Sequence, residues 1–285
     1  MKKTIINDLN TAQRADVLLA SAYPEYSRAA LAKLFDMEQI TKSDVTIKAG
    51  DRIQPGVAID ADVSEILKKA DVIELPIVYE DANVIVINKP AGIISHARGR
   101  YWDEASVASF VRDRVSGLYG ERAGIVHRLD RATSGVMVCA KNSETVAFMQ
   151  KQFSSRNVYK TYIAIVQKDV EPEAGIIDVP LARNPKNPKT FRPDPSGKEA
   201  KTEYKVVKSG ETYSTLQLHP LTGRTHQLRV HLQYIKHPIV GDELYGGEPA
   251  DRLYLHAASL EITLPGGERT VLLHQFHQNL LLNYE

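Results

Sequence analysis

One carboxylate, Asp130, lies between two arginines, Arg128 and Arg131, in a polar segment with apolar residues on both sides. Ile125–Val126 precedes this segment and Val136–Ala140 follows it, which predicts a loop between two buried strands. A nearby cation favours the ionised form of a carboxylate. We therefore expect Asp130 to be charged and able to act as a nucleophile or a base. The alternative is an ion pair that only fixes the loop.

Three further positions are candidates for chemistry or for shaping a site. Gly135 ends the polar segment, and a glycine lets the backbone turn or approach a ligand closely. Tyr162 lies in the β-branched and aromatic run 158–166, where a packed core tyrosine is the simplest interpretation. Arg229 is expected beside the buried stripe of a helix that Thr225 begins as its N-cap, so its side chain can reach inward.

The histidines and the cysteine do not predict a metal site. His226, His231 and His237 are close in sequence, but no aspartate or glutamate completes the set at helical spacing. The single cysteine, Cys139, lies in an apolar run and is expected to pack in the core.

The composition fits a globular protein with one large domain and one small one. The chain has 285 residues, of which 43% are hydrophobic and 25% charged. No apolar run is long enough to span a membrane, and the amino terminus lacks the apolar core of a signal peptide. We therefore expect a cytoplasmic protein with no membrane partner.

The net charge is only +1, but the charged residues are unevenly distributed. Residues 128–168 contain seven basic and two acidic side chains, and residues 183–208 contain eight and three. Residues 36–81 contain five and eleven. A polyanion would therefore meet the central part of the chain, unless these charges only form solvated faces.

Residues 1–62 are predicted to form a small separate α/β module, followed by a linker at 63–75. Its expected elements are two helices within 11–35, the second capped by Ser27, and short strands at 45–47 and 57–59. The stretches 26–34 and 48–53 resemble the small RNA-binding module named after a small-subunit ribosomal protein. The alternative is a helical cap that only stabilises the chain.

Residues 76–285 are predicted to form a larger α+β domain. The expected elements are a hairpin at 77–89, helices at 106–115, 143–154 and 225–235, and strands at 158–166, 202–207, 215–218, 253–256 and 260–264. Residues 180–201 contain five prolines and six basic side chains and are expected to be an exposed loop. Lys89, at the mouth of the hairpin, is expected to be solvated or to contact phosphate.

The polar segment around Asp130 is also part of a longer motif. His127–Gly135 resembles the signature of the RluA family of pseudouridine synthases. Companion segments match the family in the same order: Asn88–Gly92, Lys160–Ala164, Gly223–His231, His237–Asp242 and Leu255–Ala257. The resemblance covers about residues 75–285 and favours a catalytic Asp130 over a structural ion pair.

The resemblance implies an isomerase that converts uridine in RNA to pseudouridine by breaking the glycosidic bond, turning the uracil and rejoining it through carbon 5. It implies that Asp130 is the catalytic nucleophile or base, that Arg229 pairs with Asp130, and that Tyr162 stacks on the target base. It also implies a mixed, largely antiparallel sheet with flanking helices and a central catalytic cleft. Because the isomerisation changes no redox state and removes no group, neither a metal nor an organic cofactor is expected.

The same resemblance suggests where RNA is held. Arg128, Arg131, Lys160 and Arg224 are the expected RNA-binding side chains, with the loop 183–201 on backbone phosphates. The implied substrate is large-subunit ribosomal RNA, with transfer RNA as the alternative. No obligatory protein partner is implied.

Two other functions fit parts of the sequence. A non-catalytic RNA-binding ribosome-assembly factor would keep the fold, but the joint presence of Asp130, Tyr162 and Arg229 disfavours it. A phosphate-ester hydrolase with an aspartate nucleophile would need a second acidic metal ligand nearby. Arg131–Thr133 supplies none.

Overall fold

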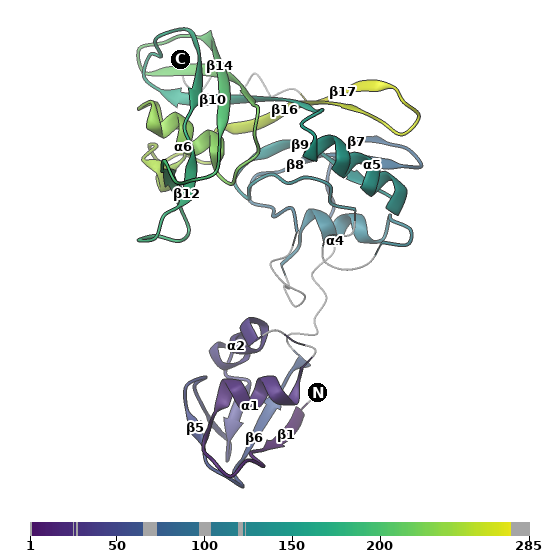
Figure 1. Cartoon of the computed structure of the whole chain (residues 1–285), viewed down its shortest axis with the longest axis vertical. Helices are drawn as coiled ribbons and strands as arrows, with labels where there is room; N and C mark the ends of the chain where they lie inside the picture. The colour runs from purple at the N-terminus through teal and green to yellow at the C-terminus, as the bar shows by residue number, and fades with distance from the viewer. Residues whose placement is uncertain are drawn as a thin grey trace. The chain divides into compact units, whose positions relative to one another are not determined.

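The computed structural model describes residues 2–24, 26, 28–64, 73–96, 104–118, 122 and 124–274 (Figure 1). The chain divides into two compact units. The first contains the described residues of Met1–Ile73, His96–Ser109 and Tyr119–Arg122, and the second those of Glu74–Ser95, Phe110–Leu118 and Ala123–Glu285. In the part of the chain that the structure describes, no helix has the length and apolar character needed to cross a membrane.

The first unit contains two short helices and two small antiparallel sheets. The helices are α1 (Ala15–Ala22) and α2 (Arg28–Asp36); the strands are β1 (Lys2–Ile6), β2 (Gln13–Arg14), β3 (Ile40–Lys42), β4 (Val45–Thr46), β5 (Arg52–Ile53) and β6 (Ala58–Asp62). The strand order is β1-β6-β3-β4 in one sheet, and β2 pairs with β5 in the other. The predicted helix pair is confirmed, whereas β1 was not predicted. Ser27 and most of the predicted linker, 65–72, lie outside the described residues.

The second unit is built on a nine-stranded sheet. Its strands are β7 (Ile77–Glu80), β8 (Val84–Lys89), β9 (Ser134–Ala140), β10 (Tyr159–Gln167), β11 (Ala174–Asp178), β14 (Lys201–Lys208), β15 (Tyr213–Pro220), β16 (Leu255–Thr263) and β17 (Arg269–Leu273). The order is β11-β14-β15-β10-β16-β9-β8-β7, with β17 also paired to β16. All these pairings are antiparallel except β9 with β16, which is parallel. The predicted α+β class with a mixed, largely antiparallel sheet is confirmed.

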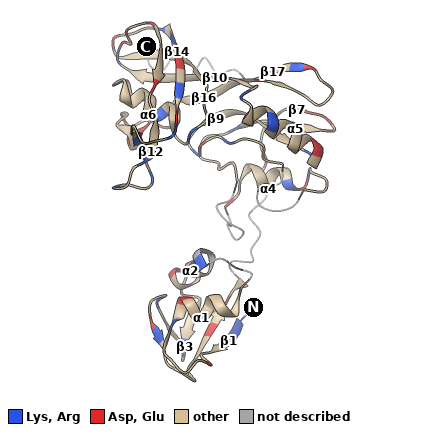
Figure 2. Ribbon diagram, viewed as in Figure 1, with Lys and Arg blue, Asp and Glu red and all other residues tan. Residues whose placement is uncertain are grey.

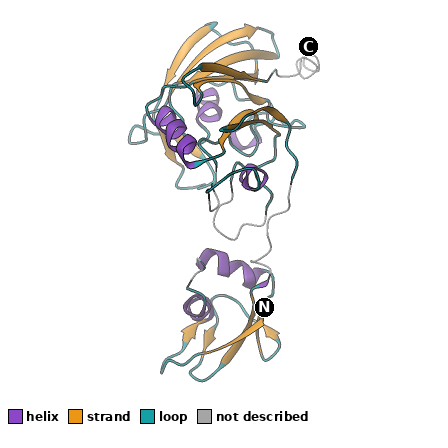
Figure 3. Ribbon diagram, turned by 90° about the vertical axis from the view of Figure 1, so that its right-hand side faces the viewer, coloured by secondary structure: helices purple, strands orange, loops and turns teal. Residues whose placement is uncertain are grey.

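Helices lie alongside this sheet (Figure 3). They are α4 (Val107–Arg112), α5 (Ser143–Ser154) and α6 (Gln227–Tyr234), with a short 3-10 helix, η1 (Glu243–Tyr245). The bounds of α5 are those predicted, because Asn142 caps the helix by accepting a hydrogen bond from the Thr145 backbone N–H at 2.9 Å. One apolar core includes α6 and strands β10, β14 and β15, and a second includes α5 and strands β8, β9 and β16.

Several predicted elements differ from the structure. The two strands expected at 253–256 and 260–264 are one continuous strand, β16. The loop expected at 180–201 contains a hairpin, β12 (Leu181–Arg183) paired with β13 (Phe191–Pro193). Pro193 is the last residue of β13, and among the described strands β13 pairs only with β12. A proline is tolerated at such an edge because few N–H groups are needed there. The N-cap of α6 is His226 rather than Thr225, and no side chain caps that helix.

The register of β16 brings two distant parts of the sequence together. Ala257 pairs with Gly135 on its β9 side and with Tyr162 on its β10 side. Gly135 has φ +119°, and a Cβ there would lie 2.3 Å from the Ala257 carbonyl oxygen. Only glycine therefore allows this approach, and the close neighbour of Gly135 is a strand of the same sheet rather than the ligand that the sequence suggested. The loop before β9 and the aromatic side chain of β10 consequently lie on either side of one strand.

Candidate active site

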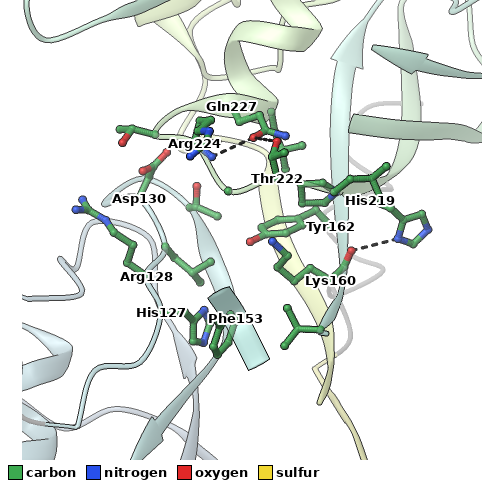
Figure 4. A pocket seen from close by; sticks show the side chains of 18 of the residues that line it. His127, Arg128, Asp130, Phe153, Lys160, Tyr162, His219, Thr222, Arg224 and Gln227 are labelled. Carbon is green, nitrogen blue, oxygen red and sulfur yellow. Dashed lines mark hydrogen bonds between the residues drawn. The ribbon is translucent and has the colours of Figure 1, made fainter. Parts of the chain in front are cut away.

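A cavity of about 800 Å³ opens in the second unit, next to the junction of β9, β16 and β10 (Figure 4). Its lining residues come from the loop 127–133, the segment 153–162, the segment 219–229 and Leu255. Asp130 and Arg128 lie on one side of the cavity, and Tyr162 and Lys160 on the other (Figure 4). The fold thus gathers most of the predicted site residues in one place.

Asp130 presents a partly exposed carboxylate to the cavity. Its side chain is 20% exposed, and its Oδ2 lies 4.0 Å from Nε2 of His226. Neither flanking arginine forms an ion pair with it within 4.0 Å among the described residues. Arg128 is exposed at the cavity wall. Arg131 does not line the cavity, and its Nη1 donates to the Gly92 carbonyl at 3.3 Å.

The loop that carries Asp130 is fixed from its buried side. Nε2 of His127 accepts a hydrogen bond from the Val138 N–H at 3.0 Å, and its ring stacks on Phe153 at 4.6 Å. Burial lowers the pKa of His127 to about 3, so the ring remains a neutral acceptor. The backbone of Leu129 exchanges hydrogen bonds with the Ser95 hydroxyl at 2.8 and 3.1 Å. Loop and strand β9 are therefore held rigidly together.

Lys89 lies beneath the same loop, contrary to the expectation that it would be solvated or contact phosphate. The side chain is fully buried, and its Nζ donates to the carbonyls of Pro90 at 2.9 Å, Ile93 at 2.7 Å and Arg131 at 3.2 Å. Burial lowers the pKa of Lys89 to about 7, while the charge of Asp130 acts in the opposite direction. A lysine with three carbonyl acceptors acts here as a structural clamp for the loop.

Arg229 reaches inward as predicted, but it pairs with a different carboxylate. Its Nε and Nη2 donate to the two oxygens of Asp242 at 2.8 and 2.6 Å, and the two side chains are 8% and 1% exposed. Its guanidinium also lies over the Tyr245 ring, 4.9 Å from the ring centre. The expected pairing of Arg229 with Asp130 is therefore wrong for this structure. Asp242 accepts from Nε and Nη2, and among the described residues no ion pair joins Arg229 to Asp130 within 4.0 Å.

Tyr162 and Lys160 form the opposite wall. Burial raises the pKa of the Tyr162 hydroxyl, and the charge of Asp130 raises it further, so the ring remains neutral. Burial lowers the pKa of Lys160, and Arg156 lowers it further. Within the described chain, the Lys160 amine forms no hydrogen bond or ion pair to a side chain, and it faces the cavity beside the Tyr162 hydroxyl (Figure 4). A cation and an aromatic ring are therefore available to a ligand together.

The loop before α6 supplies the third wall and is fixed by Gln227. The Gln227 Oε1 accepts hydrogen bonds from the Thr222 hydroxyl at 2.6 Å and from the Arg224 N–H at 3.0 Å (Figure 4). Its Nε2 donates to the Lys201 carbonyl at 2.9 Å. Arg224 lines the cavity, and its Nε donates to the Glu199 carbonyl at 2.9 Å. The guanidinium is therefore held at the cavity rim.

Four functional or structural side chains were not identified from sequence. Asp242 lay within a motif segment without a role, and His226 was considered only as a metal ligand. Tyr245 and the buried position of Lys89 had no local signal. A signal for Asp242 existed, since a buried arginine needs a carboxylate partner. Among the residues that the structure describes, no three His, Cys, Asp or Glu side chains are placed to hold a metal ion.

A carboxylate on one wall, an aromatic ring and a lysine on the opposite wall, and an arginine at the rim define a pocket for a ring-containing anionic ligand such as a nucleotide. Residues 83–234 match the RNA pseudouridylate synthase family. The chain belongs to this family and is an RNA pseudouridine synthase, which is an isomerase. The resemblance of the Asp130 motif and its companion segments to pseudouridine synthases is confirmed, whereas the RNA-binding module remains a prediction.

Curated relatives and solved structures agree with this assignment. "Ribosomal large subunit pseudouridine synthase D" of Borreliella burgdorferi is 44% identical over 67% of this chain and 61% of its own length. The protein of the same name from Xylella fastidiosa is 34% identical over 86% of this chain and 75% of its own length. The structure of human RNA pseudouridylate synthase domain containing 1 is 26% identical, with a TM-score of 0.59 over 76% of this chain and 96% of its own.

Proposed function

We propose that this chain isomerises a specific uridine of large-subunit ribosomal RNA to pseudouridine, with Asp130 as the catalytic carboxylate. The choice of RNA rests on the relatives, because those from Borreliella burgdorferi and Xylella fastidiosa are named ribosomal large subunit pseudouridine synthases. The choice of Asp130 rests on its place in the cavity. Isomerase activity itself follows from the family.

The observation that carries the proposal is a carboxylate facing an aromatic side chain across one cavity (Figure 4). An enzyme that acts on a base in RNA must take that base out of the stack. The cavity, about 800 Å³ in volume, has room for a nucleotide. In this arrangement Tyr162 stacks on the extruded uracil, and Asp130 reaches the ribose or the base as a nucleophile or a base.

The cationic side chains would then hold the RNA backbone. Arg128, Lys160 and Arg224 line the cavity and are suited to the phosphates next to the target uridine. Arg131 is exposed outside the cavity lining, so in this proposal it contacts RNA only beyond the extruded nucleotide. Basic residues also occur on β14 and on the hairpin β12–β13, where Figure 2 shows blue segments.

The proposal also assigns a function to each part of the chain. All residues that line the cavity lie between His127 and Leu255, which supports residues 76–285 as the catalytic domain. Residues 1–62 would be an RNA-binding module, joined through the linker 63–75. A ribosomal RNA substrate agrees with the expected cytoplasmic location, which remains a prediction.

The test is release of tritium from transcripts labelled at carbon 5 of uracil. Large-subunit ribosomal RNA and a transfer RNA pool are offered separately to the wild type and to Asp130→Asn, whose side chain is nearly isosteric but uncharged. We expect release from ribosomal RNA by the wild type and none by the variant, with equal RNA binding by both. Circular dichroism spectra that coincide establish that the variant folds.

Each other outcome contradicts one part of the proposal. Release by Asp130→Asn at the wild-type rate would remove Asp130 from the reaction. Release by the wild type from transfer RNA alone would change the substrate. RNA binding without release from either RNA would favour the non-catalytic assembly factor.

A further inference from the structure

His226 is the residue whose side chain faces the Asp130 carboxylate. Its Nε2 lies 4.0 Å from Oδ2 of Asp130, and its side chain is only 16% exposed. It precedes helix α6 and has φ 57° and ψ 19°, in the left-handed region. That conformation costs free energy for a residue other than glycine and is often found at functional sites. The backbone therefore holds the imidazole in this place at some cost in stability.

The other ring nitrogen is held by a buried tyrosine. Nδ1 of His226 lies 2.7 Å from the hydroxyl of Tyr245, whose side chain is only 3% exposed. The same hydroxyl accepts a hydrogen bond from the Phe191 backbone N–H at 2.9 Å. Within the described chain, Phe191 and His226 are the hydrogen-bond partners of this hydroxyl. Loop, hairpin and 3-10 helix thus converge on one imidazole.

These contacts favour one assignment of the imidazole proton. A phenol has one proton to donate. Because the Phe191 N–H is itself a donor, the phenol proton of Tyr245 is directed to Nδ1 of His226. Nδ1 is then the acceptor, so the proton of the neutral imidazole resides on Nε2. The N–H bond on Nε2 is therefore on the side of Asp130.

The surroundings keep the imidazole neutral at pH 7. Burial lowers the pKa of His226, and Asp130 acts against this shift. Arg229 and Arg128 lower the pKa further, while Asp242 raises it. The rings of Phe191 and Tyr245 present edges or faces at 5.6 Å and exclude water from two sides.

We propose that His226 is a positioning residue for Asp130 and that the Nε2–H group of His226 holds the Asp130 carboxylate turned into the cavity. Arg229 is bound to Asp242, whereas the imidazole of His226 lies 4.0 Å from the Asp130 carboxylate. The two atoms are 4.0 Å apart in this structure, and the proposal requires that this distance shorten to a hydrogen bond when RNA binds. The inference rests on the proposed role of Asp130.

The test compares three variants by single-turnover rates at saturating ribosomal RNA and by the pH profile of kcat/KM. His226→Phe keeps an aromatic ring but has no N–H, and we expect the rate to fall about tenfold to a hundredfold. The acid limb of the profile should move to higher pH, because the ionised carboxylate loses a donor. His226→Gln, whose amide nitrogen lies near the place of Nε2, should recover most of the rate. The rate of Tyr245→Phe should lie between the rates of these two variants, since Nδ1 of His226 no longer accepts the phenol proton that fixes the tautomer.

A purely structural role would not move the acid limb or distinguish glutamine from phenylalanine. In one contrary outcome, His226→Phe reacts at the wild-type rate with an unmoved acid limb while Asp130→Asn is inactive. This result would overturn the inference and leave the proposed function intact. Activity in Asp130→Asn would instead overturn the proposed function. If His226→Phe fails to fold, His226→Asn takes its place in the test. The shorter asparagine amide reaches only the place of Nδ1, so this variant also has no N–H at the place of Nε2. Equal rates for asparagine and glutamine would then overturn the inference.

Discussion

Replacing Asp242 with asparagine should destabilise the protein strongly, because this change leaves a buried guanidinium without a countercharge. Arg229 and Asp242 are joined at 2.8 and 2.6 Å, and only 8% and 1% of the two side chains are exposed. Removing one partner of a buried ion pair typically costs about 3–5 kcal/mol. Asparagine retains one oxygen that accepts from the arginine. We therefore expect the lower end, about 3 kcal/mol of unfolding free energy.

The chain offers a matched control on its surface. Arg269 and Glu261 are joined at 2.6 Å, but 40% and 36% of their side chains are exposed. Glu261→Gln makes the same carboxylate-to-amide change as Asp242→Asn. Water and salt screen an exposed pair, so this variant should lose less than about 1 kcal/mol. The two pairs differ in burial and in the number of hydrogen bonds, since Arg229 makes two to its partner and Arg269 makes one.

Equilibrium urea unfolding at pH 7, followed by circular dichroism, measures both changes. Equally small losses in the two variants would refute the reasoning that burial makes the Arg229–Asp242 pair important. A double variant, Arg229→Met with Asp242→Leu, provides a further check. It should be more stable than Asp242→Asn, since replacing both partners leaves no buried charge alone. A double variant less stable than the single one would contradict that explanation.

Three further predictions concern the loop and the cavity. Gly135→Ala should lower the unfolding free energy by more than about 3 kcal/mol, because its Cβ would meet a backbone oxygen of β16 at 2.3 Å. Gly266→Ala, with φ +111° and nothing within 4 Å, should cost only the backbone strain of about 1–3 kcal/mol, and equal losses in urea would refute the steric reason. Burial lowers the pKa of Lys89 to about 7, below the value of about 10.4 in unfolded chains. Between these two pH values the unfolded state binds more protons than the folded state. The difference in unfolding free energy between the wild type and Lys89→Met should therefore increase from pH 7 to pH 10. A difference that does not change with pH would contradict the lowered pKa of Lys89. Lys160→Gln should weaken RNA binding and reduce the slope of log affinity against log salt by about 1, whereas Lys151→Gln, on α5 outside the cavity lining, should leave the slope unchanged.

Much of the local structure was predictable because local forces decide it. Helix α5 was predicted with its observed bounds, since the apolar period within it is a local signal. The β-branched run 158–166 became β10 almost unchanged. Short or paired elements were harder, because β12 and β13 depend on each other rather than on their own composition.

The motif around Asp130 also identified the candidate carboxylate and singled out Gly135 from the sequence alone. Residue types such as an aspartate in a polar loop, a glycine before a buried strand and an aromatic side chain in a strand are written in the sequence. Their spatial relation is not, since Gly135 and Tyr162 meet only through their common neighbour Ala257. Strand register is a long-range property that the fold decides.

The tertiary structure alone decided the partners of the charged groups. Arg229 had two carboxylates available, and the approach of η1 to α6 gave it Asp242 instead of Asp130. Lys89 had the sequence position of a solvated strand end, but the loop 90–93 folds over its amine and supplies carbonyl acceptors. Pairing energies depend on burial and distance, which local sequence does not contain. The sequence therefore determined the chemical groups and the family of this protein, and the fold determined which of those groups act on one another.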